Sequence, residues 1–301
     1  MDGFRVDVMW HLIIDEQFRN NPVNPNYEGE GSTYGQLIPA FSTDQPEVHM
    51  IVEMMRSLMD KYENRVLIGE IYLPIHKLVS YYGLNNKEAH LPFNFTLIEL
   101  PWDAKRIEAA VDEYEGSLPA EGWPNWVLGN YDKSRIATRV GEKQAKIAAL
   151  LLLSLKGTPT MYYGDEIGMT DVVIPKEKIQ DPREENVPGK GLNRDTERTP
   201  MQWDESKFAG FSNSELWLPL MDDYEKVNVQ KEKEDPESIL NFYLRMIKLR
   251  QQEPALHIGE YIPVPTEGNL FSYLRTSHET KFFIILNMGN EEEDFDPDLP
   301  D

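Results

Sequence analysis

The chain has 301 residues, no cysteine and a formal net charge of −22, and 40% of its residues are hydrophobic. This composition predicts a globular protein with a sizeable core, and it excludes disulfides and thiolate metal sites. The strong acidic excess argues against nucleic acid and anionic membranes as partners. Because the sequence has neither a bilayer-length apolar run nor a signal-like start, we predict a cytoplasmic location.

The first 170 residues alternate short apolar segments with helical patterns. We predict strands over 3–9, 65–72, 91–97, 125–131 and 158–164, and helices over 46–63, 103–115 and 135–156. Strands that alternate with helices are typical of βα units and a parallel sheet.

The rest of the chain changes in character. Residues 170–234 are rich in Pro, Gly and charge and are predicted to form a long loop. An amphipathic helix over 235–252 follows, with Asp235 as its N-cap and Pro236 at its first position. We assign residues 1–256 to an α/β domain that includes the loop. Residues 257–301 are assigned to a small, truncated β module with an acidic tail.

An acidic residue stands at the predicted end of three strands: Asp7, Glu70 and Asp132. Function in parallel α/β folds collects at the carboxyl ends of the strands. A single such residue more often caps a helix or meets solvent, but three together predict a site.

Two of these carboxylates suit one known reaction. Side chains on adjacent parallel strands can approach the spacing of about 5–5.5 Å that retaining glycoside hydrolysis requires. Arg5 is expected to keep Asp7 ionised, since a nearby cation lowers the pKa of a carboxylate. Glu70 follows apolar residues, and a dry environment would raise its pKa and suit a general acid.

Several motifs resemble glycoside hydrolase family 13, the α-amylase superfamily. "GFRVDV" (3–8), "IGEIYLP" (68–74) and "GNYDKSR" (129–135) are similar to its fourth, fifth and seventh barrel strands, and "GTPTMYYGDEIGM" (157–169) to its eighth. "NRDTERTPMQWD" (193–204) resembles a loop of the α-glucosidase and oligo-1,6-glucosidase branch. The resemblance implies a partial (β/α)8 TIM barrel that contains the equivalents of strands 4–8.

The resemblance also implies roles for individual residues. Asp7 would be the nucleophile, Glu70 the acid/base, and Asp132 a holder of sugar hydroxyls. Arg5, Tyr131, Arg135 and Trp203 would contact the substrate or the carboxylates, and Val8 points weakly to α-1,6 linkages. The expected activity is that of a retaining α-glucosidase on short α-1,4- or α-1,6-glucosides, with transglycosylation as a further option.

Two departures from the family pattern are visible. Tyr131 stands where the family has histidine, which weakens the expected support of the transition state. Counterparts of the first three barrel strands are absent, so the chain is either a truncated product or a fragment, or it folds by an unusual route. Open sheet edges invite pairing, and we therefore expect a homo-oligomer.

The alternative function is a catalytically impaired sugar-binding or scaffold protein derived from a truncated family 13 enzyme. Trp203 and Met201 could line a sugar site or anchor the long loop, and the sequence favours the two roles equally. The six histidines have no metal-ligand spacing, so we predict neither a metal site nor a cofactor.

Overall fold

The computed structural model describes residues 2–27, 33–278 and 280–295; residues 296–301 of the predicted acidic tail lie outside them. The chain forms two compact units. The first contains residues 1–96 and 113–126, and the second contains residues 97–112 and 127–301. In the described residues, no helix is long and apolar enough to cross a membrane.

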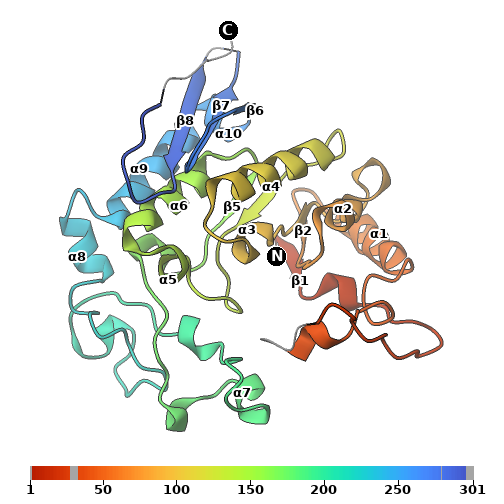
Figure 1. Ribbon diagram of the computed structural model, residues 1–301, viewed down its shortest axis with the longest axis horizontal. Helices are drawn as coiled ribbons and strands as arrows, with labels where there is room; N and C mark the ends of the chain where they lie inside the picture. Colours follow the sequence, from red (N-terminus) through yellow and green to blue (C-terminus); the bar gives the residue numbers. More distant parts are fainter. Residues whose placement is uncertain (1, 28–32, 279, 296–301) are drawn as a thin grey trace. The chain divides into compact units, whose positions relative to one another are not determined.

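The first unit contains a three-stranded parallel sheet, of which β1 and β2 are labelled in Figure 1. β1 (Gly3–Val6) pairs with β2 (Val66–Gly69), which pairs in turn with β3 (Leu91–Pro92). Arg5 lies opposite Ile68 in this register, so β1 and β2 end side by side. The predicted parallel sheet is confirmed, although each strand ends earlier than expected. The predicted strand 91–97 is wrong in its second half, because the helix α3 begins at Thr96.

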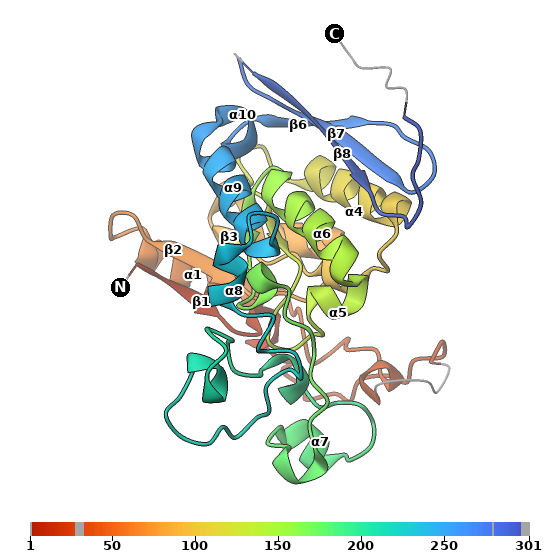
Figure 2. The ribbon, with the colours of Figure 1, turned by 90° about the vertical axis from the view of Figure 1, so that its left-hand side faces the viewer.

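The remaining described strands form two further sheets. β4 (Asn125–Val127), where the chain passes into the second unit, pairs with β5 (Thr158–Thr160). β6 (Glu260–Val264), β7 (Leu270–Thr276) and β8 (Lys281–Asn287) form an antiparallel sheet (Figures 1 and 2). This sheet lies within residues 257–301, for which the sequence predicts a separate β module, and it belongs to the second unit.

The helices follow the strands in chain order. The α-helices are α1 (Val48–Met59), α2 (Ile75–Leu78), α3 (Thr96–Glu99), α4 (Ala104–Ser117), α5 (Ile136–Val140), α6 (Glu142–Ser154), α7 (Pro182–Asn186), α8 (Val229–Glu234), α9 (Ile239–Gln252) and α10 (Pro254–His257). Short 3-10 helices are η1 (Met9–His11), η2 (Thr33–Gln36), η3 (Val79–Tyr82), η4 (Leu84–Asn86), η5 (Asp165–Ile167), η6 (Lys176–Lys178), η7 (Asp195–Glu197) and η8 (Lys207–Gly210).

The single helix predicted over 135–156 is wrong. Gly141 separates α5 from α6 with a φ of 81°, a conformation that side-chain-bearing residues rarely adopt. The predicted N-cap of the later helix is also wrong. Ser238 caps α9 by accepting the N–H of Asn241, whereas Asp235 accepts the N–H of Glu237 in the preceding turn.

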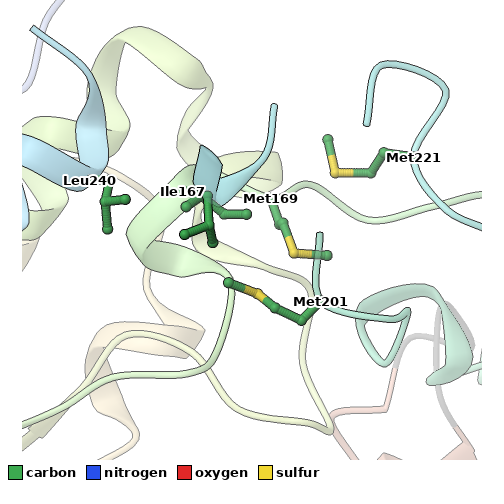
Figure 3. Close-up of a cluster of buried hydrophobic side chains, with 6 residues drawn as sticks. Ile167, Met169, Met201, Met221 and Leu240 are labelled. Carbon is green, nitrogen blue, oxygen red and sulfur yellow. The ribbon is translucent and has the colours of Figure 1, made fainter. Parts of the chain in front are cut away.

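Buried apolar side chains hold the second unit together. α6 and α9 pack through Ala149, Leu153 and Tyr243, and the two helices run side by side in Figure 2. A methionine-rich cluster also binds the long loop to the η5 turn and to the start of α9 (Figure 3). Its members are Ile167, Met169, Met201, Met221, Val229 and Leu240. Met201 therefore anchors the loop, which was one of its two expected roles.

Candidate active site

Asp7 and Glu70 leave their strands at neighbouring positions in the first unit. The N–H of Glu70 donates to the carbonyl of Val6 over 3.0 Å, which extends the β1–β2 ladder by one step. Asp7 and Glu70 therefore lie just beyond the carboxyl ends of adjacent parallel strands, as the sequence predicted. This is the edge where α/β folds place reactive groups.

Arg5 links the two carboxylates. Its Nη1 donates to Oδ1 of Asp7, and its Nη2 lies 3.1 Å from Oε1 of Glu70. The side chain of Asp7 is 60% exposed, whereas that of Glu70 is 2% exposed. One carboxylate is thus open to a ligand, and the other lies beneath the surface beside the same cation.

Burial raises the pKa of Glu70, and the neighbouring Asp7 raises it further. The N–H of Val8 and the guanidinium of Arg5 act against this, because both stabilise the ionised form. The net effect is a pKa above the ordinary value, as a general acid requires.

Val8 has a strained backbone. Its φ and ψ are 41° and 47°, in the left-handed region that β-branched residues avoid. This conformation aims its N–H at Oε2 of Glu70 over 2.9 Å. Strain of this kind costs about 1–2 kcal/mol and persists where surrounding structure enforces it. The residue after Asp7 therefore fixes the orientation of Glu70.

In the second unit, Asp132 meets two arginines. Its Oδ1 accepts from Nη1 of Arg194 over 2.8 Å and from Nη2 of Arg198 over 2.7 Å. Arg198 also donates through Nε to the carbonyl of Tyr131, and its guanidinium carbon lies 5.3 Å from the centre of that ring. Tyr131 and Asp132 thus share one arginine.

Arg194 is held from its other side by Asp181. Nε and Nη2 of Arg194 donate to the two oxygens of Asp181 over 2.8 and 2.7 Å. Asp181 is almost fully buried, and this arginine holds the pKa of its carboxyl well below the usual range. The pair gives Arg194 a fixed position before any ligand binds.

Arg135 lies apart from Asp132. Its guanidinium donates to the carbonyl of Tyr163 over 2.6 Å and stacks near the rings of Tyr162 and Tyr163, with centroid distances of 5.0 and 4.7 Å. The residue has no exposed surface, so the structure does not present its guanidinium to a sugar. Burial also raises the pKa of nearby Asp165 to about 7, with Arg135 acting against the rise.

Trp203 is half exposed on the long loop. Its backbone N–H donates to the carbonyl of Ala209 over 2.9 Å, and its carbonyl accepts the N–H of Gln230 over 3.0 Å. The backbone is fixed while the indole remains open to solvent. This arrangement is compatible with a stacking surface for a sugar, which is one of the two roles predicted for Trp203.

Arg194, Arg198 and Asp181 are not among the site residues that the sequence predicts. Both arginines lie within the quoted "NRDTERTPMQWD" motif, so a signal was present. Their partner Asp132 precedes Arg194 by 62 residues, and no local pattern announces such a pairing. Among the residues described here, no group of three or more acidic or histidine side chains has metal-binding geometry.

The parallel sheet of the first unit, with Asp7 and Glu70 just beyond the ends of β1 and β2, defines an α/β fold with a candidate glycosidase-type site. The chain belongs to the α-amylase family, because the model for "Alpha amylase, catalytic domain" matches residues 1–259. The predicted resemblance to glycoside hydrolase family 13 is confirmed.

Three relatives illustrate the family membership. An α-glucosidase of Culex pipiens is 34% identical over 309 residues, which cover 98% of this chain and 50% of that protein. A human amino acid transporter heavy chain is 32% identical over 302 residues, covering 96% of this chain and 43% of that protein. A crystal structure of an α-glucosyl transfer enzyme has a TM-score of 0.88 at 28% identity, covering 95% of this chain and 56% of that one. The chain thus spans about half the length of these proteins.

Proposed function

We propose that this chain provides the acid/base and nucleophile of a retaining α-glucosidase that acts on short α-1,4- or α-1,6-glucosides. The observation that carries the proposal is the Asp7–Arg5–Glu70 arrangement. An exposed carboxylate and a buried one, whose pKa is raised, share one guanidinium at the ends of adjacent strands.

The two carboxylates would divide the chemistry between them. Asp7 attacks the anomeric carbon while Glu70 gives its proton to the departing oxygen, and a glycosyl-enzyme forms. Glu70, now ionised, then takes a proton from water, which attacks the same carbon and releases the sugar with retained configuration. In the second unit, taken by itself, Asp132 and Trp203 are proposed to contact a sugar, with Tyr131 acting through Arg198. Arg135 is buried against Tyr162 and Tyr163 and is proposed to support this unit's site indirectly.

Hydrolysis of an aryl α-glucoside panel by the purified chain tests the proposal. Asp7→Ala should abolish turnover, because a methyl group cannot form the glycosyl-enzyme. The circular dichroism spectrum should stay unchanged, since Asp7 is exposed. If Asp7→Ala retained the wild-type rate, the assignment of the nucleophile would be wrong.

We also propose that the glycosyl-enzyme can pass its sugar to a second sugar in place of water. The structural relative named an α-glucosyl transfer enzyme supports this proposal. Product analysis at high maltose or isomaltose concentration should then reveal longer oligosaccharides. Glucose as the sole product would count against transfer.

A second candidate is a catalytically impaired sugar-binding or scaffold protein. The relative named an amino acid transporter heavy chain supports a role other than hydrolysis, because its identity to this chain is close to that of the α-glucosidase. Calorimetric binding of maltose or isomaltose in the absence of hydrolysis would favour this candidate over the enzyme.

We further propose that the first unit pairs with a second copy of the chain. β1 has a partner on one side only among the described strands. The helix α1 presents an apolar row, Met50, Met54 and Leu58, whose members are 54–64% exposed. Sedimentation at micromolar concentration should show a dimer that Met54→Glu dissociates, and a stable wild-type monomer would refute the pairing.

A further inference from the structure

One oxygen of Asp132 is fixed by two cations in the second unit. Arg194 and Arg198 both donate to Oδ1, and the side chain is 18% exposed. In the part of the chain that the structure describes, Oδ2 of Asp132 takes part in no hydrogen bond with another residue. The carboxylate is therefore oriented through one oxygen, while the other remains available to a ligand hydroxyl.

Both cations are themselves anchored. Arg194 sits on the buried Asp181 through two side-chain hydrogen bonds. Nε of Arg198 donates to the carbonyl of Tyr131 over 2.7 Å, and the guanidinium carbon of Arg198 lies 5.3 Å from the centre of the Tyr131 ring. Planar guanidinium groups lose little freedom when each is held at two points. We call Asp132, Asp181, Arg194 and Arg198 the clamp, and it orients the carboxylate of Asp132 before a ligand binds.

The four charged side chains of the clamp also balance. Asp132 and Asp181 carry two negative charges, and Arg194 and Arg198 carry two positive charges. A carboxylate neutralised in this way attracts a distant cation weakly, but it still accepts a short hydrogen bond from a hydroxyl. The clamp thus favours oriented contact with a hydroxyl over long-range electrostatic attraction.

We infer that Arg198 is a positioning residue that aims Asp132 at a sugar hydroxyl, and that Tyr131 serves as its platform through ring and carbonyl. This inference rests on the proposed function, because it names how that site holds its sugar. The phenol hydroxyl of Tyr131 has no part in the platform, which separates this role from direct hydrogen bonding to substrate.

A double-mutant cycle on sugar affinity tests the link. The dissociation constant for isomaltose is measured by calorimetry for wild type, Asp132→Asn, Arg198→Gln and the double variant. Loss of a charge-assisted contact should weaken binding about tenfold in each single variant, and the double variant should be no weaker than Asp132→Asn. Additive losses would overturn the inference. Arg106→Gln, an exposed arginine on α4, serves as the matched control.

Two variants of Tyr131 test the platform. Tyr131→Phe keeps the ring face and the carbonyl, whereas Tyr131→Leu removes the ring. In kcat/KM and in isomaltose affinity, Tyr131→Leu should lose about five times more than Tyr131→Phe, in line with a cation–π contact. Equal losses in the two variants would assign the role to the hydroxyl and overturn the platform.

The proposed function can fail separately from this inference. If the wild-type chain neither turns over glucosides nor binds isomaltose, the proposed function is refuted. The same cycle is then read from thermal unfolding, which requires no sugar. Coupled Tm shifts for Asp132→Asn and Arg198→Gln would support the clamp, and additive shifts would refute it.

Discussion

Glu70→Gln replaces the buried carboxyl with an amide of nearly the same shape. The amide oxygen can still accept the N–H of Val8, which donates over 2.9 Å, but the amide NH2 then takes the place of Oε1 and cannot accept from Nη2 of Arg5. The side chain of Arg5 is 30% exposed and still contacts Asp7, so the fold should persist. The variant lacks the proton that the carboxyl would give to a leaving group. It therefore tests the role of Glu70 as general acid without changing the fold.

The size of the effect on rate depends on the leaving group. A positioned general acid contributes about 100- to 10,000-fold to such reactions. An alkoxide leaving group needs that proton, whereas a nitrophenolate departs without it. Glu70→Gln should therefore lose about 1,000-fold or more in kcat/KM on isomaltose, and much less on a nitrophenyl glucoside.

The same variant should change how stability depends on pH. The pKa of Glu70 lies above its ordinary value of 4.5 in the folded chain, because burial disfavours the ionised form. The folded state then binds the proton more tightly than the unfolded state. The contribution of Glu70 to stability is full below pH 4.5 and is lost as pH rises through the folded pKa.

Urea unfolding of wild type and Glu70→Gln between pH 4 and pH 8 measures the pH-dependent contribution of Glu70 to the free energy of unfolding. The free energy of unfolding of the variant should rise relative to wild type as pH increases, by about 1.4 kcal/mol for each unit of raised pKa. A constant or falling difference would refute the burial argument. Equal rate losses on both kinds of glucoside would refute the role as acid.

Three further variants test the second unit by urea unfolding. Arg250→Met removes donors to the buried carbonyls of Leu153, Leu155 and Gly157 and should cost about 3–5 kcal/mol, whereas Arg245→Met, exposed on the same helix, should cost about 1 kcal/mol or less. Similar costs would contradict a stabilising role of these three hydrogen bonds. Gly141→Ala should cost about 1–2 kcal/mol through its positive φ alone, since open space surrounds the new methyl group; a neutral result would place the break elsewhere. Ser238→Ala should cost about 1 kcal/mol and more than Asp235→Ala, and the reverse order would restore the cap predicted from sequence.

Local patterns in the sequence were sufficient to locate the parallel strands and to place Asp7 and Glu70 at the ends of two of them. The prediction that Asp132 ends a strand is wrong, because β4 ends at Val127, five residues earlier. Asp7 and Glu70 each follow an apolar run, and a strand ends where its apolar run ends. The same reasoning failed at Gly141, because glycine is tolerated inside a helical pattern and its φ is set by packing. It failed again at Asp235, because Asp235 and Ser238 are both good caps and only the tertiary fold chooses between them.

The sequence by itself determined that Asp7 and Glu70 stand at strand ends, since that property depends on residues next to each other in the chain. Tertiary structure alone decided that Glu70 is buried while Asp7 is exposed, and that Arg135 has no exposed surface. It also decided that Arg194 and Arg198 meet Asp132. The chain folds back over more than 60 residues to bring these charges together, and the pairing depends on that path and not on any local pattern.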